Sequence, residues 1–135
     1  MFRKLRYLLD RKGCYVIADA KDNSVTFSKG LCSLLDLFNL DQVKVYVAEL
    51  TGTGGAKEYA FILNPKIDEP TQLADIMYNS KHKCVGFESL CPTVNRIFYD
   101  YGLPADSTCR LSVRQGRTAD GSVTYYRICN PSARK

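Results

Sequence analysis

The sequence predicts an α+β fold in which two strand–strand–helix–strand–strand units in tandem pack as one pseudo-twofold-symmetric domain. Three observations lead to this prediction: an internal repeat, alternating apolar stretches around short helical ones, and a length of 135 residues that suits one domain. Each unit has about 60 residues and would bury too little surface to be stable by itself. We therefore expect both units to share one core.

The repeat is clearest where residues 43–65 align without a gap on residues 109–131. Chance would give about one or two identities over this span. The identical pairs are Val47/Val113, Gly55/Gly121, Tyr59/Tyr125, Ile62/Ile128, Asn64/Asn130 and Pro65/Pro131. Further upstream, the matching pairs are Val25/Val85, Phe27/Phe87, Leu31/Leu90, Cys32/Cys91 and Leu40/Leu103. The duplication therefore covers most of the chain.

The first unit is predicted to span residues 14–67. Runs rich in β-branched and aromatic residues indicate its strands, and turn-forming or glycine-rich segments at 21–24 and 51–56 separate them. The expected strands are residues 14–18, 25–27, 43–47 and 59–63.

An amphipathic helix is expected between the two hairpins of this unit, over residues 28–40. Leu31, Leu34, Leu35 and Phe38 recur at the spacing of one helical face, and Ser28 is a suitable N-cap.

The second unit is predicted to span residues 68–131. Residues 71–79 fit either a short helix or a strand, and their position in the repeat favours the strand. A helix is expected over residues 90–101, with Gly102 as its C-cap. The remaining expected strands are residues 84–87, 109–113 and 123–129, with a loop at 115–121.

Basic residues are concentrated at the two ends of the chain, within a net charge of +5. The basic N-terminal segment, residues 1–13, carries five basic residues and one acidic residue, and residues 109–135 carry six and one. The last four residues, 132–135, are expected to form a tail. Basic ends around a mildly acidic middle suit contact with a polyanion such as nucleic acid, and they equally suit a solvated surface.

The apolar pattern of residues 25–37, followed by the alternating strand at 43–47, resembles the AbrB-like swapped-hairpin family. The resemblance extends over about residues 14–63 and more faintly over 72–129 through the repeat. It implies a swapped-hairpin barrel, built here from one chain, and DNA binding, often in transcriptional control. Some members of that family bind protein partners instead.

The favoured function is a small non-enzymatic DNA-binding protein, and the alternative is a protein-interaction or structural assembly module. Arg110 and Arg114 lie four residues apart on a predicted strand, so they share a face, and Lys44 aligns with Arg110 in the repeat. Tyr125 and Tyr126 must point to opposite faces, one toward the core and the other available for a base. The residues expected to contact phosphates are Arg3, Lys4, Arg6, Arg11, Lys12, Lys44, Arg110, Arg114 and Arg117.

Enzymatic chemistry is not expected. The one histidine, His82, lies in a basic turn with no orienting acid, and the six cysteines form no C-x-x-C pair, so they are expected to be free thiols. We expect no metal, no cofactor and no membrane span, and a cytoplasmic monomer or homodimer, because no signal peptide or long apolar run is seen.

Overall fold

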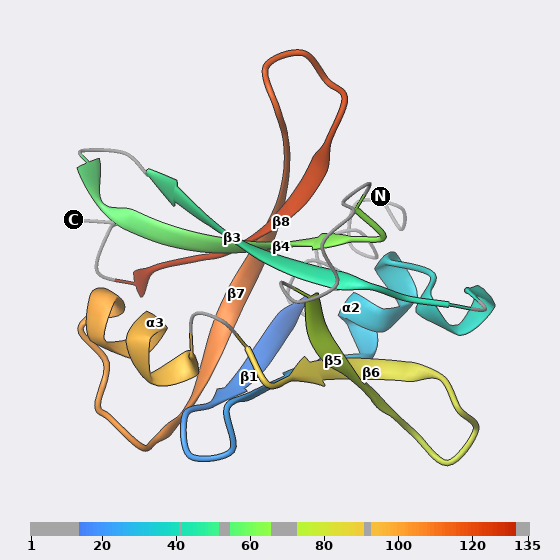
Figure 1. Cartoon of the computed structure of the whole chain (residues 1–135), viewed down its shortest axis with the longest axis horizontal. Coiled ribbons are helices and arrows are strands. Elements are labelled where there is room, and N and C mark those ends of the chain that lie inside the picture. Colours follow the sequence, from blue (N-terminus) through green and yellow to red (C-terminus); the bar gives the residue numbers. More distant parts are fainter. Residues whose placement is uncertain (1–13, 41, 52–54, 66–72, 91–92, 132–135) are drawn as a thin grey trace, which may run out of the picture.

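The computed structural model describes residues 14–40, 42–51, 55–65, 73–90 and 93–131. Their eight strands close into one antiparallel barrel with two short α-helices on its outside (Figure 1). The fold is therefore mostly β with a few helices. The strands are β1 (Tyr15–Asp19), β2 (Ser24–Phe27), β3 (Val45–Thr51), β4 (Lys57–Leu63), β5 (Leu73–Tyr78), β6 (Cys84–Glu88), β7 (Thr108–Arg117) and β8 (Thr124–Ile128).

Strand neighbours around the barrel follow the order β1-β2-β6-β5-β3-β4-β8-β7, and β7 pairs back to β1. Four hairpins are local in sequence, and the other four pairings join strands of the two halves of the chain. β1 pairs with β7 and β5 with β3, while β2 pairs with β6 and β4 with β8. This cyclic order is unchanged when β1–β4 are exchanged with β5–β8.

The gapless alignment of the two closing strands is wrong by one residue. In the β3–β4 hairpin Val47 lies opposite Phe61, whereas in the β7–β8 hairpin Val113 lies opposite Ile128. Phe61 and Ile128 both face the core, while Arg127, the partner of Phe61 in that alignment, lies on the other face. The identities found between the closing strands, such as Tyr59/Tyr125, are therefore not equivalent positions, because a one-residue shift moves each side chain to the opposite face.

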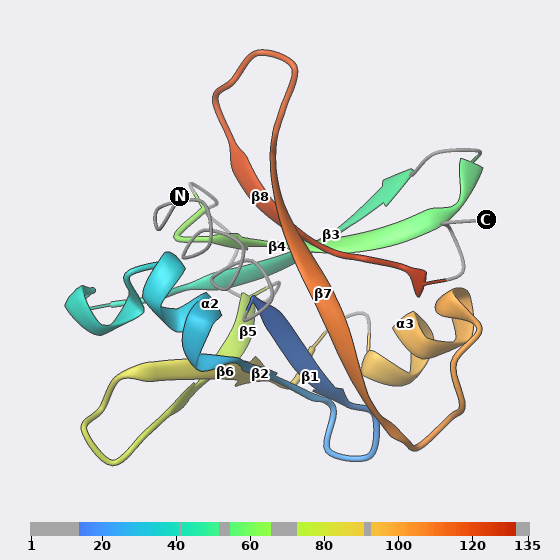
Figure 2. The same cartoon turned by 180° about the vertical axis from the view of Figure 1, so that it is seen from behind.

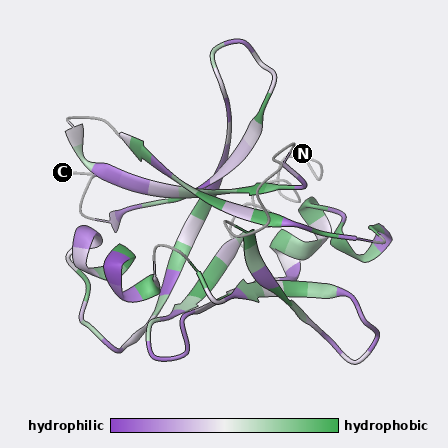
Figure 3. Cartoon of the chain, in the orientation of Figure 1, coloured by the Kyte–Doolittle hydropathy of each residue, from purple (hydrophilic) through white to green (hydrophobic). Residues whose placement is uncertain are grey.

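Aromatic side chains fill the interior of the barrel. The rings of Phe27, Phe61 and Phe87 contact one another at centroid distances of 5.3 to 5.6 Å, and all three residues are buried. Hydrophobic residues line the centre of the molecule, and hydrophilic ones gather at the turns that project from it (Figure 3). The strands therefore surround a packed core.

The first helix is shorter than its hydrophobic pattern predicts. Helix α2 (Lys29–Leu34) begins after Ser28, whose hydroxyl accepts a hydrogen bond from the Leu31 N–H, which confirms the N-cap. Asp36 then takes a left-handed conformation (φ 56°), which ends the helix, and the 3-10 helix η1 (Leu37–Asn39) follows. This break directs Leu37 into the core and leaves Phe38 exposed, and Leu34 is exposed within the helix itself. The expected apolar helical face is therefore wrong at Leu34 and Phe38.

Helix α3 (Val94–Tyr101) ends at Gly102, which takes the left-handed C-cap conformation as predicted. Its N-cap is Thr93, so the helix begins later than residue 90. The match between Leu31 and Leu90 fails for this reason, since Leu31 follows its N-cap by three residues and Leu90 precedes its own by three.

Two strand assignments are resolved by the pairing. Residues 73–78 form strand β5 rather than a helix. Strand β7 continues to Arg117, through residues expected to be a loop, because Gln115, Gly116 and Arg117 pair with Tyr126, Tyr125 and Thr124 of β8.

Candidate nucleic-acid interface

The β7–β8 hairpin extends past its neighbours and forms a projecting arm, which we define as residues 113–125. β7 pairs with β1 only as far as Ser112, and β8 pairs with β4 only from Tyr126 onward. The arm therefore has two free edges and stands away from the barrel in both views (Figures 1 and 2). Such a two-stranded ribbon has the dimensions of elements that contact nucleic acid.

A hydrogen-bond network holds the tip of the arm in shape. The Asp120 carboxylate accepts hydrogen bonds from the Thr118 hydroxyl (2.6 Å) and from the Ser122 N–H and hydroxyl (3.0 and 2.7 Å). These bonds, that from Thr118 foremost, lower the pKa of Asp120 to about 2. Gly121 supplies the left-handed residue of the turn (φ 74°). The arm thus carries a negative charge at its tip, and hydrogen bonds from its own polar groups stabilise that charge.

The outer face of β7 carries the arginines that the sequence predicts to share a face. Arg110, Ser112 and Arg114 are exposed, while the intervening Cys109, Leu111 and Val113 pack on the core, so this prediction is confirmed. Arg117 is also exposed, but its position in the alternation puts it on the other face of the arm.

Aromatic side chains lie beside these arginines. The Arg110 guanidinium lies 3.5 Å from the centre of the Tyr15 ring, across the β1–β7 pairing. Tyr125 lies over Gly116 on the arm, where an added β-carbon would come within 2.6 Å of its ring. Tyr126 faces inward and stacks on Phe61 at 5.3 Å. The expected division of the two adjacent tyrosines between core and outer face is therefore confirmed.

Sequence reasoning missed Arg127 as a member of this face. Arg127 lies directly opposite Arg114, and its guanidinium is 3.5 Å from the buried carboxylate of Glu58. The same carboxylate accepts a hydrogen bond from the Asn130 N–H (2.9 Å), so it stays anchored in the barrel wall. Residues two apart on a strand share a face, so the sequence could have placed Arg127 on the same face as Tyr125.

Lys44 does not join the arginine face. It flanks β3, where its N–H donates to the Asn64 side chain (2.8 Å). The pairings across β3, β4, β8 and β7 put Lys44 level with the tip of the arm and Arg110 level with the opposite end of the sheet. The two residues are exposed at diagonal corners. The remaining predicted contacts, Arg3, Lys4, Arg6, Arg11 and Lys12, lie outside the described residues.

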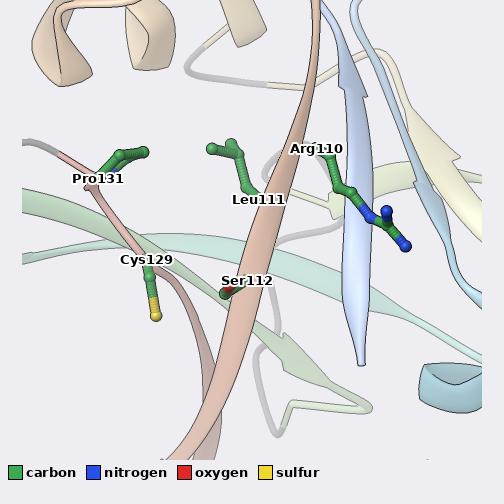
Figure 4. A pocket seen from close by; sticks show the side chains of 5 residues that line it. All are labelled: Arg110, Leu111, Ser112, Cys129 and Pro131. Atoms are coloured by element: carbon green, nitrogen blue, oxygen red, sulfur yellow. The ribbon is translucent and has the colours of Figure 1, made fainter. Parts of the chain in front are cut away.

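A shallow hollow of about 230 Å³ lies where β7 and the end of β8 separate (Figure 4). The Leu111 and Pro131 side chains lie on one side of it, and the Arg110 guanidinium points away across β1. Its lining residues are Arg110, Leu111, Ser112, Cys129 and Pro131. Apolar side chains, the Ser112 hydroxyl and the Cys129 thiol line the hollow, so it offers packing and hydrogen bonding.

The thiols and the histidine lie apart from the arginine face or are buried. Burial raises the pKa of the Cys32 and Cys84 thiols, which are free, as are those of Cys109 and Cys129. His82 is exposed at the β5–β6 turn. Within the described part of the chain, no three histidine, cysteine or acidic side chains are grouped to hold a metal ion, and no helix has the length and apolar character needed to cross a lipid bilayer.

No family model, curated protein or solved structure matches the chain. The resemblance to the AbrB-like family therefore stays a prediction from the sequence.

Proposed function

We propose that this protein is a small non-enzymatic DNA-binding protein, with transcriptional control as the expected setting. The observation that carries the proposal is the row formed by Arg110, Arg114 and Arg127 on one continuous outer face of β7 and β8. We call this row the arginine face. Arginine side chains exposed on the outer face of a β-ribbon suit contact with the phosphates of a nucleic acid.

Charge balance supports the same proposal. Among the described residues, no carboxylate lies within 4 Å of the side chains of Arg110, Arg114 or Arg117, although ion pairs form elsewhere on the barrel. Their positive charges are therefore available to an external anion. The basic segment at residues 1–13 would add to the attraction.

We further propose that the two halves of the chain descend from one duplicated unit and form a swapped-hairpin barrel. The exchange of β1 and β5 between the halves, with β1 on β7 and β5 on β3, supports this arrangement. It agrees with the sequence resemblance to the AbrB-like family, which implies DNA binding. The arginine face itself departs from this symmetry, because the register equates Arg114 with Ala48 and Arg127 with Ala60.

Binding titrations with a labelled DNA duplex at two salt concentrations test the proposed function. We expect affinity to fall steeply as salt rises, because each phosphate contact releases a counterion. Replacing both Arg110 and Arg114 by alanine should lower the affinity about tenfold or more at low salt.

The matched control replaces Lys29 and Lys81, two exposed basic residues of other elements, and removes the same charge. An equal loss in the control would show that net charge alone drives binding. The absence of any binding to DNA at low salt would refute the proposed function.

A protein-interaction module is the second candidate. Leu34 and Phe38 on α2 and η1 are 58% and 46% exposed, which is unusual for large apolar side chains so close in sequence. Exchanging both for serine would leave DNA binding unchanged, and self-association in sedimentation experiments would fall if this surface joins two copies.

A further inference from the structure

We infer that the nucleic acid held by this protein is single-stranded and lies across the outer face of β1, β7 and β8. This inference rests on the proposed function and specifies that the nucleic acid bound is a single strand rather than a duplex. The face combines the arginine face with two aromatic residues, Tyr15 and Tyr125. Interleaved rings and arginines are the features that bind unpaired bases and their phosphates together.

The aromatic residues are placed for stacking rather than for packing. Tyr15 and Tyr125 both lie on the outer side of their strands and are partly exposed. Tyr15 is covered by the Arg110 guanidinium, whose planar group is itself a surface on which a base can stack. Tyr15 lies opposite Ser112, and Tyr125 lies opposite Gly116, so their backbone positions are about 13 Å apart along β7.

Glycine at position 116 is required for the placement of Tyr125. An added β-carbon would meet three atoms of that ring at 2.6 to 2.7 Å. The ring therefore occupies the space above the β7 backbone that a side chain would otherwise fill. One base could stack on Tyr125 in the arm and another on the Tyr15–Arg110 pair where the arm leaves the barrel. Arg114 and Arg127 lie between these two places.

Symmetry argues against a duplex on this face. A duplex has twofold symmetry, which a protein matches with equivalent contacts on both halves. Of the three arginines on this face, Arg110 alone has a basic counterpart, Lys44, which lies at the diagonal corner of the sheet. The register equates Arg114 with Ala48 and Arg127 with Ala60. A single strand has no such symmetry and can follow one row of arginines.

The arginine face is also poor in competing anions. Glu58 is buried and contacts Arg127, and Asp19 at the far end of β1 accepts hydrogen bonds from the N–H groups of Lys21 and Asp22. A phosphate backbone on this face would meet polar and basic groups along most of its path.

Direct comparison of ligands tests the inference. Fluorescence anisotropy with the whole protein would measure binding of a twelve-nucleotide oligothymidine, the matching oligouridine and a mixed-sequence duplex of twelve base pairs. We expect both single strands to bind about tenfold or more tightly than the duplex, and the ratio between the two shows whether the DNA or the RNA strand is preferred. Duplex affinity equal to or above that of the single strands would overturn the inference while leaving the proposed function standing.

Variants of the stacking residues give an independent check. Tyr125→Ala should weaken oligothymidine binding about fivefold or more, whereas Tyr125→Phe keeps the ring and should bind nearly as well as the wild type. Gly116→Ala displaces the ring and should behave like Tyr125→Ala. Tyr78→Ala removes an exposed tyrosine of β5 and is the control. Unchanged affinity in Tyr125→Ala, with thermal unfolding unchanged, would also overturn the inference, and no binding of any nucleic acid would refute the proposed function instead.

Discussion

The hydroxyl of Tyr101 connects helix α3 to two strands of the barrel. It accepts a hydrogen bond from the Tyr59 N–H (2.8 Å) and donates one to the Ile128 carbonyl, and Tyr101 is fully buried. Tyr59 in turn donates its hydroxyl to Asp100 of the same helix. Burial, together with that hydrogen bond, raises the pKa of Tyr59, and burial also raises that of Tyr101, so both phenols stay protonated in neutral solution.

Tyr101→Phe should lower the free energy of unfolding by about 1–3 kcal/mol, because a buried donor and a buried acceptor would each lose a partner. Urea denaturation followed by circular dichroism measures the change. Tyr99→Phe is the control, since Tyr99 is 82% exposed, and its stability should equal that of the wild type. Equal stabilities of all three proteins would contradict this account of Tyr101.

The carboxyl of Asp120 makes the tip of the arm sensitive to acid. Hydrogen bonds from Thr118 and Ser122 favour its ionised form and lower its pKa to about 2. Because the pKa is lower in the folded protein than in the unfolded chain, this stabilisation is complete above about pH 4 and is lost as pH falls through 2.

Titration of the Asp120 side-chain carbon by NMR should give a midpoint near 2, with the Ser122 amide resonance shifting in parallel. Thr118→Val removes the strongest of these hydrogen bonds and should raise the midpoint toward the ordinary value for aspartate, about 4. A wild-type midpoint already near 4 would show that the network does not form in solution.

At the residue scale, the sequence predicts neighbours on one strand but not across strands. Arg110 and Arg114 share a face because strands alternate with period two. The contact of Arg110 with Tyr15 depends on which residues pair between β1 and β7, and the position of Arg114 opposite Arg127 depends on the pairing of β7 with β8. The repeat alignment is off by one residue in β8. The single face that these side chains form therefore emerges only from the structure.

Among the elements, strand β6 depends on close contact with β2. Gly86 lies opposite Thr26, and an added β-carbon there would fall 2.2 Å from the backbone oxygen of Val25. Backbone cannot move aside as a side-chain ring can, so Gly86→Ala should cost about 1–3 kcal/mol of stability.

Thermal unfolding of Gly86→Ala and Gly116→Ala compares the two cases. The Gly116 variant should unfold within a few degrees of the wild type, because only the mobile end of Tyr125 obstructs the added methyl group. If the Gly86 variant is as stable as the wild type, the β2–β6 contact is looser than described.

The elements themselves are well predicted where apolar residues alternate and poorly where polar ones dominate. Strands β1, β2, β3, β4 and β6 lie near their expected positions because each contains buried apolar residues, whereas β5 has no fully buried residue and its sequence also fits a helix. The end of β7, from Gln115 to Arg117, is polar on both faces and is expected to be a loop, although pairing with β8 makes it a strand. The predicted helix over residues 28–40 is longer than α2, because the apolar spacing continues past Asp36, whose left-handed conformation ends the helix.

For the whole molecule, the barrel is completed only by pairings between the halves. Residues 1–67 and 68–135 expressed separately should each lack a folded monomeric state, because each would leave the partners of its outer strands behind. Mixing them in equal amounts should restore the barrel, which NMR and circular dichroism would detect. A folded monomer of either half alone would contradict the shared core.

The pairing of β1 with β7 has a consequence for biosynthesis. Tyr15 lies opposite Ser112, so β1, once it has left the ribosome, lacks its second neighbour until β7 has also been made. Contacts between such distant residues close slowly, and an unpaired strand is prone to aggregation in the meantime. We therefore expect the nascent chain to acquire its tertiary structure late, after β7 emerges, rather than progressively during translation.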